Sequence, residues 1–388
     1  MLLLGLGVYC TLCLVLTVLY ALLLGMYVAG WLSLPQWKPP ANYEPATTIS
    51  LLIPARNEEN KIAACLQSVV SQQYPANLLE VVVIDDHSTD QTAQIVQTWA
   101  QQYPHIKLIR LQDILPQAEQ LNAYKKKAIE IGIGQTSGKL IVTTDADCFT
   151  HPRWLHTIAA FFETHRLQMI AAPVCFAQEQ SFFERFQTLD FFGMMVSAGA
   201  TLHWRLGAMC NGANLAYTRQ AFNAVQGFKG IDHLASGDDM LLMAKIMRHY
   251  PNAVKFLKNA EATVYTTAQP TLSAFVNQRV RWASKSAQYQ HKQTTLFLAI
   301  VFLFNLSIMV NAVLLAVGKT AFLPLLLVQL LFKFIADWVY LYVGARFWGR
   351  GSLLWWFLPA QLLHLFYIVV IGLWGNVGKY TWKGRVVR

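Results

Sequence analysis

The feature that most constrains this chain is the uneven distribution of its charged residues. Residues 1–37 contain no Asp, Glu, Lys or Arg, and the stretch after Gln293 is nearly as poor in charge. Residues 45–292 hold most of the ionisable groups. With 55% hydrophobic and 13% charged residues, the chain is too apolar for an ordinary soluble protein. We therefore expect a water-facing domain carried between membrane-embedded segments.

Four apolar stretches are long enough to cross a bilayer, which takes about 20 helical residues at about 1.5 Å each. Residues 1–32 lack the basic start of a secretion signal and exceed the length of its apolar part, so a retained transmembrane helix is expected. Two further spans, residues 295–317 and 321–343, open a C-terminal block of transmembrane or interfacial helices over residues 295–375.

The last apolar segment, residues 353–375, is long enough to cross but contains Pro359, Gln361 and His364. A third crossing after a cytoplasmic domain would put the basic tail, residues 376–388, outside, against the positive-inside tendency. We predict a break near Pro359, with the segment lying partly along the interface or re-entering, and its polar side chains facing protein or water. Three ordinary spans followed by an unusual tail are the alternative.

The formal net charge of +10 raises the question of a polyanionic partner. Many of the basic residues flank the apolar segments, a pattern typical of cytoplasmic ends beside anionic lipid. They form no stripe interleaved with aromatic residues, so nucleic-acid binding is not expected. The six cysteines suggest no disulfide framework, and Cys10 and Cys13 form a CxxC inside an apolar helix, where packing is expected.

The middle region, residues 45–292, is predicted to form one α/β domain with a Rossmann-like, doubly wound sheet. Short β-branched runs alternate there with polar, helix-length segments, as in βαβ units. The strand candidates are residues 49–55, 79–86, 106–111, 139–147 and 168–176. The helix candidates are residues 57–73, 89–102, 125–136 and 152–165. The following aromatic segment, residues 181–204, is expected either to lie along the membrane surface or to form a buried helix.

Two acidic clusters follow predicted strands. Asp85 and Asp86 end the second strand, and Asp145 and Asp147 end the fourth. Ligands of doubly wound sheets bind beyond the carboxyl ends of the strands, so both clusters are site candidates. Alternation along an extended segment would put Asp145 and Asp147 on one side, where their oxygens suit Mg²⁺ or Mn²⁺. A bare DxD also occurs in solvated turns.

Six motifs in order resemble those of the family 2 glycosyltransferases. They are IPARNEE at 53–59, VVIDDHSTD at 82–90, TTDADC at 143–148, NGANLAYTRQAF at 211–222, SGDDMLL at 236–242 and QRVRW at 278–282. The resemblance covers residues 48–285 and implies a GT-A nucleotide-sugar domain. It also implies an inverting transfer from a UDP-sugar donor with the aid of a divalent cation.

For the nucleoside of the donor, the resemblance implies a role for the first two motifs. Asp86 would accept a hydrogen bond from the uracil imide, supported by Asp85, and the backbone from Pro54 to Arg56 would flank the base. Helix capping and turn formation are the alternative roles for the two aspartates.

For the diphosphate, the resemblance implies that Asp147 is a metal ligand and that Asp145 contacts ribose, or the metal through water. Arg281 of the QxxRW motif would hold the departing diphosphate. Lys125, the first of three consecutive lysines, is a further candidate, although a solvated helix face explains such a run equally well.

For catalysis, Asp239 aligns with the residue that takes the proton from the acceptor hydroxyl. Asp238 stands where relatives more often carry Glu, which leaves the division of roles within the pair open. An aspartate at the start of a helix also stabilises that helix, and this is the alternative reading.

For the acceptor, the resemblance implies contacts from Gln278, Trp282, Asn211 and Asn214. Turn formation is the alternative for the two asparagines, and interfacial anchoring is the alternative for the Arg-Trp pair.

The function expected from these features is transfer of a sugar to an acceptor held at the membrane, with the catalytic domain on the cytoplasmic side of a multi-pass inner-membrane protein. A lipid acceptor is favoured over a growing glycan because few membrane segments remain to build a channel. The ending YTWKGRVVR is similar to the tails of ceramide and hopanoid-type lipid glycosyltransferases. A processive polysaccharide synthase and a non-catalytic nucleotide-sugar-binding scaffold are the alternatives.

Overall fold

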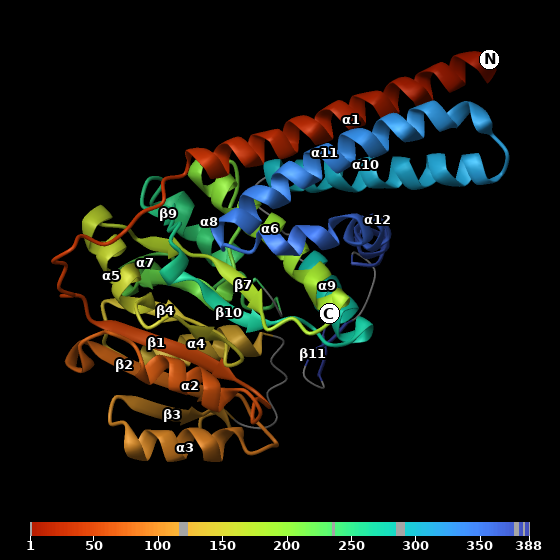
Figure 1. Cartoon of the computed structure of the whole chain (residues 1–388). Coiled ribbons are helices and arrows are strands. Elements are labelled where there is room, and N and C mark those ends of the chain that lie inside the picture. Colours follow the sequence, from red (N-terminus) through yellow and green to blue (C-terminus); the bar gives the residue numbers. More distant parts are fainter. Residues whose placement is uncertain are drawn as a thin grey trace. The chain divides into compact units, whose positions relative to one another are not determined.

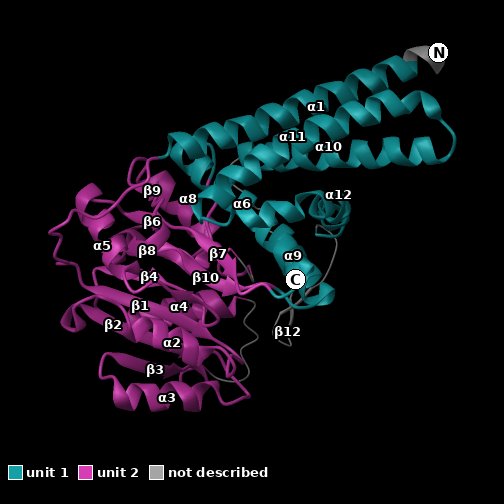
Figure 2. Ribbon diagram, in the orientation of Figure 1, with its two compact units in different colours: residues 1–34, 180–207, 269–378 teal, residues 35–179, 208–268, 379–388 magenta. Residues whose placement is uncertain are grey.

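The computed structural model describes residues 2–115, 123–234, 237–284, 292–375, 380–382 and 385–387 (Figure 1). Of the predicted basic tail, residues 376–379, 383, 384 and 388 lie outside the described residues. The chain divides into two compact units (Figure 2). Unit 1 comprises residues 1–34, 180–207 and 269–378, and unit 2 comprises residues 35–179, 208–268 and 379–388.

Unit 2 is built on a seven-stranded sheet with the order β3-β2-β1-β4-β8-β6-β9. Its strands are β1 (Ile49–Ala55), β2 (Leu79–Asp85), β3 (Ile106–Arg110), β4 (Leu140–Thr143), β6 (Met169–Ala171), β8 (Leu215–Thr218) and β9 (Val254–Phe256). The first four are parallel, and β8 runs antiparallel to β4 and β6. Residues on successive positions of β1 and β2 are buried, as strands covered on both faces require.

Helices and a smaller sheet complete unit 2. The helices are α2 (Ile62–Val70), α3 (Thr92–Gln102), α4 (Tyr124–Gly134), α5 (Trp154–His165), α7 (Arg219–Ala224) and α8 (Met240–His249). The smaller sheet has the order β5-β10-β7, formed by Phe149–Thr150, Val264–Thr267 and Val174–Ala177. The short strands β11 (Tyr380–Trp382) and β12 (Arg385–Val387) pair with each other.

The first three predicted strands are confirmed, whereas two others need correction. The fourth ends at Thr143 instead of continuing through the acidic residues. The fifth is split into β6 and β7, which belong to different sheets and are separated at Pro173. Proline has no N–H to donate to a strand ladder, so the chain changes sheets there. The sheet is therefore mixed around a Rossmann-like parallel core.

The described residues of unit 1 form helices and their connections. The helices are α1 (Leu2–Ser33), α6 (Phe182–His203), α9 (Leu272–Ala283), α10 (Lys292–Ala316), α11 (Leu323–Phe347) and α12 (Phe357–Trp374), the last preceded by a 3₁₀ segment, η7 (Gly351–Trp356). Four helical stretches of the described chain are long and apolar enough to cross a membrane, and they contain α1, α10, α11 and η7 with α12. In Figure 2, α1, α10 and α11 lie alongside one another, whereas α12 is seen nearly end-on.

The aromatic segment after β7 forms α6, which is buried over most of its length. Two of its glycines allow the close approach of neighbouring helices. A Cβ on Gly193 would lie 2.7 Å from the ring of Tyr340, and a Cβ on Gly199 would lie 2.7 Å from Trp31. Of the two alternatives that the sequence left open, the buried helix is the one observed.

The predicted break near Pro359 is wrong in its position. Pro359 lies in the first turn of α12, where its missing N–H is not needed for an intrahelical hydrogen bond. The irregular part is η7, which ends at Trp356. The polar side chains of the segment face protein as predicted, because Gln361 is buried and His364 contacts Lys333 of α11.

Candidate functional site

The carboxyl ends of β1, β2 and β4 and the beginning of β8 lie at one edge of the large sheet. The pairing aligns Ala55 with Asp85 and Thr143 with Leu215. The Thr143 hydroxyl donates to the carbonyl oxygen of Gly212 at 3.0 Å, which ties the loop before β8 to the end of β4. In open α/β sheets, ligands bind outside this edge where the strand order reverses, here between β1 and β4. The site is therefore sought at this edge.

The acidic segment after β4 is a turn. The backbone N–H of Cys148 donates to the carbonyl oxygen of Asp145 at 3.1 Å. The expectation that strand alternation aligns Asp145 with Asp147 is therefore wrong, since the strand has already ended. Both carboxyl groups are nevertheless partly exposed, at 38% and 28%, and each faces a lysine. Lys61 Nζ lies 3.8 Å from Asp147 Oδ2.

Lys125 joins two of the predicted motifs. Its Nζ lies 2.6 Å from Asp145 Oδ1 and 3.2 Å from Asp238 Oδ2. Burial alone would lower the pKa of Lys125, but the two carboxylates outweigh it and hold that pKa above its usual value. The ammonium therefore remains charged and brings the segment after β4 to the segment before α8.

Gly212 makes room for this cluster. A Cβ at this position would lie 3.1 Å from Asp238 Oδ2, 3.3 Å from Lys125 Nζ and 3.5 Å from the Cβ of Asp239. Contacts of 3.1 to 3.3 Å are too short for a methyl group without a shift of the neighbours. The glycine thus lets the backbone of NGAN approach the charged side chains.

Asp239 caps helix α8. Its Oδ1 accepts a hydrogen bond from the N–H of Met240 at 2.7 Å, and its Oδ2 accepts one from the N–H of Gly212 at 3.2 Å. The capping role considered from the sequence is therefore present. Since both donors are backbone groups, the capping also fixes the direction in which the carboxylate points. A carboxylate oxygen can accept more than one hydrogen bond, so capping and proton transfer are compatible.

Asp85 and Asp86 are both buried at the end of β2. Asp85 Oδ2 accepts a hydrogen bond from the Ser88 N–H at 3.4 Å, whereas its Oδ1 has no hydrogen-bond partner among the described residues. Burial raises the pKa of Asp85. Asp86 Oδ1 lies 3.0 Å from His87 Nδ1. The buried Oδ1 of Asp85 therefore marks a place where a further hydrogen-bond donor is expected.

Arg56 organises the same loop from the end of β1. Its Nη1 donates to the carbonyl oxygens of Asp86 at 2.6 Å and His87 at 3.0 Å. Pro54 lies within β1, paired with Ile84. The structure thus brings all four residues predicted to surround the nucleoside to one end of the β1-β2 pair.

The two predicted acceptor asparagines have structural partners. Asn211 Oδ1 accepts a hydrogen bond from the Ala213 N–H at 2.9 Å and caps a short 3₁₀ turn. Asn214 is fully buried: its Nδ2 donates to the carbonyl oxygens of Pro173 and Ala262, and its Oδ1 accepts from Trp154 Nε1. Its amide hydrogens are therefore both used inside the protein. This corrects the assignment of Asn214 to an acceptor pocket.

The predicted QxxRW motif lies in α9 of unit 1. Trp282 packs near Phe191 with 6.1 Å between ring centroids, and Gln278 Oε1 is buried without a hydrogen-bond partner among the described residues. The intervening Arg279, which the sequence did not single out, is buried, pairs with Asp190 at 2.9 Å and lies over the Trp282 ring at 4.3 Å. Arg281 itself is half-exposed.

The residues of the acidic turn fit a hard divalent cation. No group of three or more His, Cys, Asp or Glu side chains suited to a metal occurs within the described ranges. Two partly exposed carboxylates, Asp145 and Asp147, are nonetheless what Mg²⁺ or Mn²⁺ takes from a protein when substrate phosphates and water supply its other ligands. The neighbouring Lys61 and Lys125 compensate the negative charge of the two carboxylates.

The sequence reasoning missed Lys61, Gly212 and Arg279. Lys61 precedes α2 and Arg279 is a variable position of its motif, so only the fold places them against Asp147 and Trp282. The sequence did offer a reason to select Gly212, because a glycine directly after a capping Asn often marks a close approach of the backbone to another group.

Comparison with known sequences identifies two overlapping matches. The family described as "Glycosyl transferase family 2" matches residues 50–225, and the one described as "Glycosyl transferase family group 2" matches residues 140–371. The second match extends over more than half of the chain.

Individual relatives match over part of their length. A probable glycosyltransferase, YdaM, of Bacillus subtilis is 24% identical over 265 residues, covering 65% of this chain and 57% of that protein. The beta-monoglucosyldiacylglycerol synthase of Synechocystis sp. is 27% identical over 267 residues, covering 66% and 52%. Glycosyltransferase AglE of Haloferax volcanii is 36% identical over 107 residues, covering 28% and 33%. The chain thus spans between a third and somewhat over half of these relatives.

A solved structure shares the fold over nearly the whole chain. It is the mannosyltransferase PcManGT from Pyrobaculum calidifontis in complex with GDP-Man and Mn²⁺, with a TM-score of 0.63, 18% sequence identity and coverage of 94% of this chain and 99% of that one. The mixed sheet with its Rossmann-like core is therefore a GT-A fold.

Proposed function

The chain belongs to the family 2 glycosyltransferases, and from this premise we propose that it transfers a sugar from a UDP-sugar to a lipid acceptor held at the membrane, with inversion at the anomeric carbon. The observation that carries the proposal is the Lys125 bridge between Asp145 and Asp238. It supports a single site in which a motif suited to the donor diphosphate adjoins a motif suited to a catalytic base.

The nucleoside of the donor would bind at the end of the β1-β2 pair. The orphaned Oδ1 of Asp85 and the carboxylate of Asp86 are acceptors that suit the imide N–H of uracil. Arg56 holds the loop carbonyls of Asp86 and His87, and with Pro54 it would flank the base. In this arrangement, either Asp85 or Asp86 can accept the hydrogen bond from the imide N–H.

The diphosphate would lie over the turn after β4. Asp147 and Asp145 would hold Mg²⁺ or Mn²⁺, which when bound neutralises charge on the departing diphosphate. Lys125 and Lys61 supply positive charge beside the same carboxylates. From α9, Arg281 would hold the diphosphate as it leaves.

Asp239 is proposed to accept the proton of the acceptor hydroxyl. As that proton moves to the carboxylate, the acceptor oxygen bonds to the anomeric carbon and the bond to the diphosphate oxygen breaks on the opposite face. Asp238 is the second candidate, because its Oδ2 already pairs with Lys125 Nζ at 3.2 Å. Asn211, Gln278 and Trp282 remain proposed contacts of the acceptor.

A lipid acceptor is supported by the apolar helices and by one relative. Four helical stretches are long enough to cross a membrane, and the Synechocystis relative is named for the synthesis of a glucosyl diacylglycerol. We propose that residues 45–292 act on the cytoplasmic side of the inner membrane. The basic residues that flank the apolar segments support this orientation.

The test is transfer from labelled donors by the purified full-length protein in lipid vesicles with Mn²⁺. UDP-sugars and GDP-mannose are compared, because the structural neighbour was solved with GDP-Man. We expect label from a UDP-sugar to enter the organic phase on extraction, and Asp239→Asn to prevent this while still binding UDP. Label in long water-soluble chains would instead indicate a processive synthase. Donor binding without any UDP release would indicate a scaffold.

A further inference from the structure

Helix α12 has one wholly apolar exposed face. Leu358, Leu362, Phe366, Val370 and Leu373 follow one another at intervals of three or four residues, and each is between 45% and 61% exposed. At this spacing the five side chains form a stripe along the length of the helix. Trp355 before the stripe and Trp374 at its end are also exposed.

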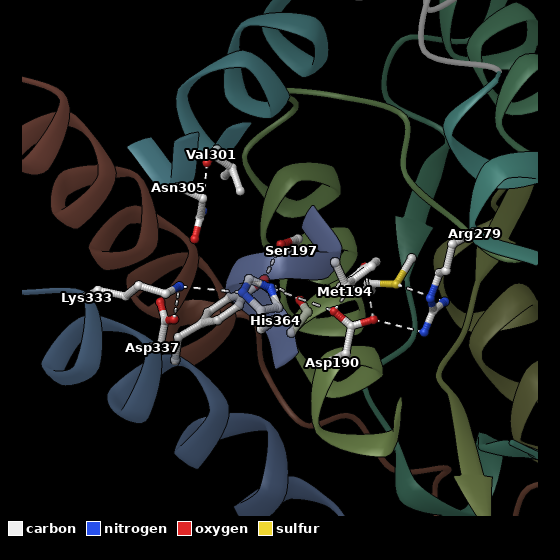
Figure 3. A network of polar contacts seen from close by, with 12 residues as sticks. Asp190, Met194, Ser197, Arg279, Val301, Asn305, Lys333, Asp337 and His364 are labelled. Atoms are coloured by element: carbon white, nitrogen blue, oxygen red, sulfur yellow. Dashed lines mark hydrogen bonds and ion pairs between the residues drawn. The ribbon is translucent and has the colours of Figure 1, made fainter. Parts of the chain in front are cut away.

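The opposite face of α12 carries polar side chains and is held by other helices of unit 1. His364 Nδ1 lies 3.5 Å from Lys333 Nζ, and its Nε2 lies 3.9 Å from Asp190 Oδ1 (Figure 3). The Tyr367 hydroxyl donates to Asp190 Oδ2 at 3.3 Å. Asp190 pairs in turn with Arg279 of α9. The polar face is therefore fixed to α6, α9 and α11, and the apolar face is turned away from them.

The buried charges of this network are balanced. Lys333 pairs with Asp337 one turn along α11 at 2.7 Å, and Arg279 pairs with Asp190 at 2.9 Å. His364 lies between the two pairs (Figure 3). Neither ion pair has a partner on α12, so α12 is held in its orientation by the contacts of His364 and Tyr367 with this network.

The course of the chain limits how many helices can cross. Unit 2 joins the C-terminal end of α1 at residues 34 and 35, and β11 and β12 also belong to unit 2. If α1, α10 and α11 each cross, the end of α11 returns to the side of unit 2. A crossing by α12 would then leave β11 and β12 on the far side. The six Cα–Cα steps from Trp374 to Tyr380 span about 20 Å at most, which is too short to return through a core of about 30 Å.

We propose that α12 does not cross the bilayer but lies along its surface on the side of unit 2, with the stripe from Leu358 to Leu373 in contact with lipid acyl chains. The end-on view of α12 beside the lengthwise α1, α10 and α11 agrees with this arrangement (Figure 2). Exposed tryptophans at both ends of the stripe suit the headgroup layer, where Trp is favoured. The inference rests on the membrane anchoring of the proposed function, but not on its catalytic part.

The test compares depths in the bilayer along two helices of the full-length protein. Single cysteines replace Leu358, Leu362, Phe366 and Leu373 in α12, in a background in which Cys10 and Cys210, the cysteines that are not buried, are serine. Each is spin-labelled in phosphatidylcholine and phosphatidylglycerol vesicles, and its depth is measured from relaxation by oxygen and by a water-soluble nickel chelate.

Matched controls are cysteines at exposed positions of α10: Leu296, Leu303, Val310 and Val313. Only variants that keep the thermal midpoint of the parent protein are compared. We expect the α12 labels to share one shallow depth, about 5 to 10 Å below the headgroup boundary. The fifteen helical steps from Leu358 to Leu373 correspond to about 22 Å along a helix, so a crossing would spread the depths over that distance.

Depths that rise and fall along α12 as they do along α10 would overturn the inference and leave the anchoring of the proposed function intact. Equal shallow depths along both helices would show that α10 does not cross the bilayer either. That result would overturn the membrane anchoring on which the proposed function and this inference both rest. A uniform shallow profile in α12 with a crossing profile in α10 supports the proposal.

Discussion

Replacing Lys125 with methionine removes the ammonium between two carboxylates while keeping most of the side-chain volume. The Lys125 and Asp238 side chains are 20% and 12% exposed, and leaving a buried charge without its partner costs about 3 kcal/mol. Asp145 is 38% exposed, so the loss of its pair adds about 0 to 1 kcal/mol. The expected decrease in the free energy of unfolding is therefore about 3 kcal/mol, a large share of the 5 to 15 kcal/mol typical of a domain.

Chemical unfolding followed by tryptophan fluorescence measures this decrease, and Lys127→Met is the matched control. Lys127 is on the same helix and pairs with Glu130 at 3.2 Å, but both side chains are exposed, so about 0.5 kcal/mol or less is expected. Adding Asp238→Asn to Lys125→Met removes the carboxylate charge that faced Lys125 and should restore part of the stability. Equal losses for the two lysine variants, or no restoration by the second substitution, would refute the reasoning.

Three further outcomes are expected. Asp239→Asn should lower the turnover number about 10²- to 10⁴-fold with little change in donor affinity, because a base acts in the transition state; unchanged turnover would transfer the role to Asp238. Asp147→Ala should abolish turnover in Mn²⁺ titrations of chelator-treated protein, and near-normal activity would exclude it as a ligand. Since burial raises the pKa of Asp85, its charged form is disfavoured in the folded state. Asp85→Asn should therefore raise stability near neutral pH, and the gain should shrink as pH falls through the raised pKa and vanish below about 3.9; a gain that does not depend on pH would contradict this cause.

The parallel half of the sheet could be predicted closely from the sequence, because β1 and β2 are nearly continuous apolar runs bounded by polar segments. The strands that follow β7 could not be predicted. Strands β8, β9 and β10 have only three or four residues each, and periodicity over so few positions does not distinguish a strand from a loop. Their place in the sheets depends on partners far away in the chain.

Within the site, the sequence does not show which of three consecutive lysines faces the carboxylates. The sequence offers nothing to distinguish Lys125, Lys126 and Lys127, yet only Lys127 lies on a solvated helix face. Lys125 meets the two carboxylates, and Lys126 is buried and donates to the carbonyl oxygens of Ile231 and Leu234. Helical geometry turns successive residues by about 100°, so which lysine faces the site is decided by how α4 packs.

The capping of α8 by Asp239 has a consequence for reading related sequences. A carboxylate that stabilises a helix start is retained for folding even in a descendant that no longer transfers sugar, so its presence alone does not identify an active enzyme. Asparagine caps helices as well as aspartate does but takes up no proton under physiological conditions. An Asn at this position, more than an Ala, would be the mark of a relative that has kept its architecture and given up its chemistry.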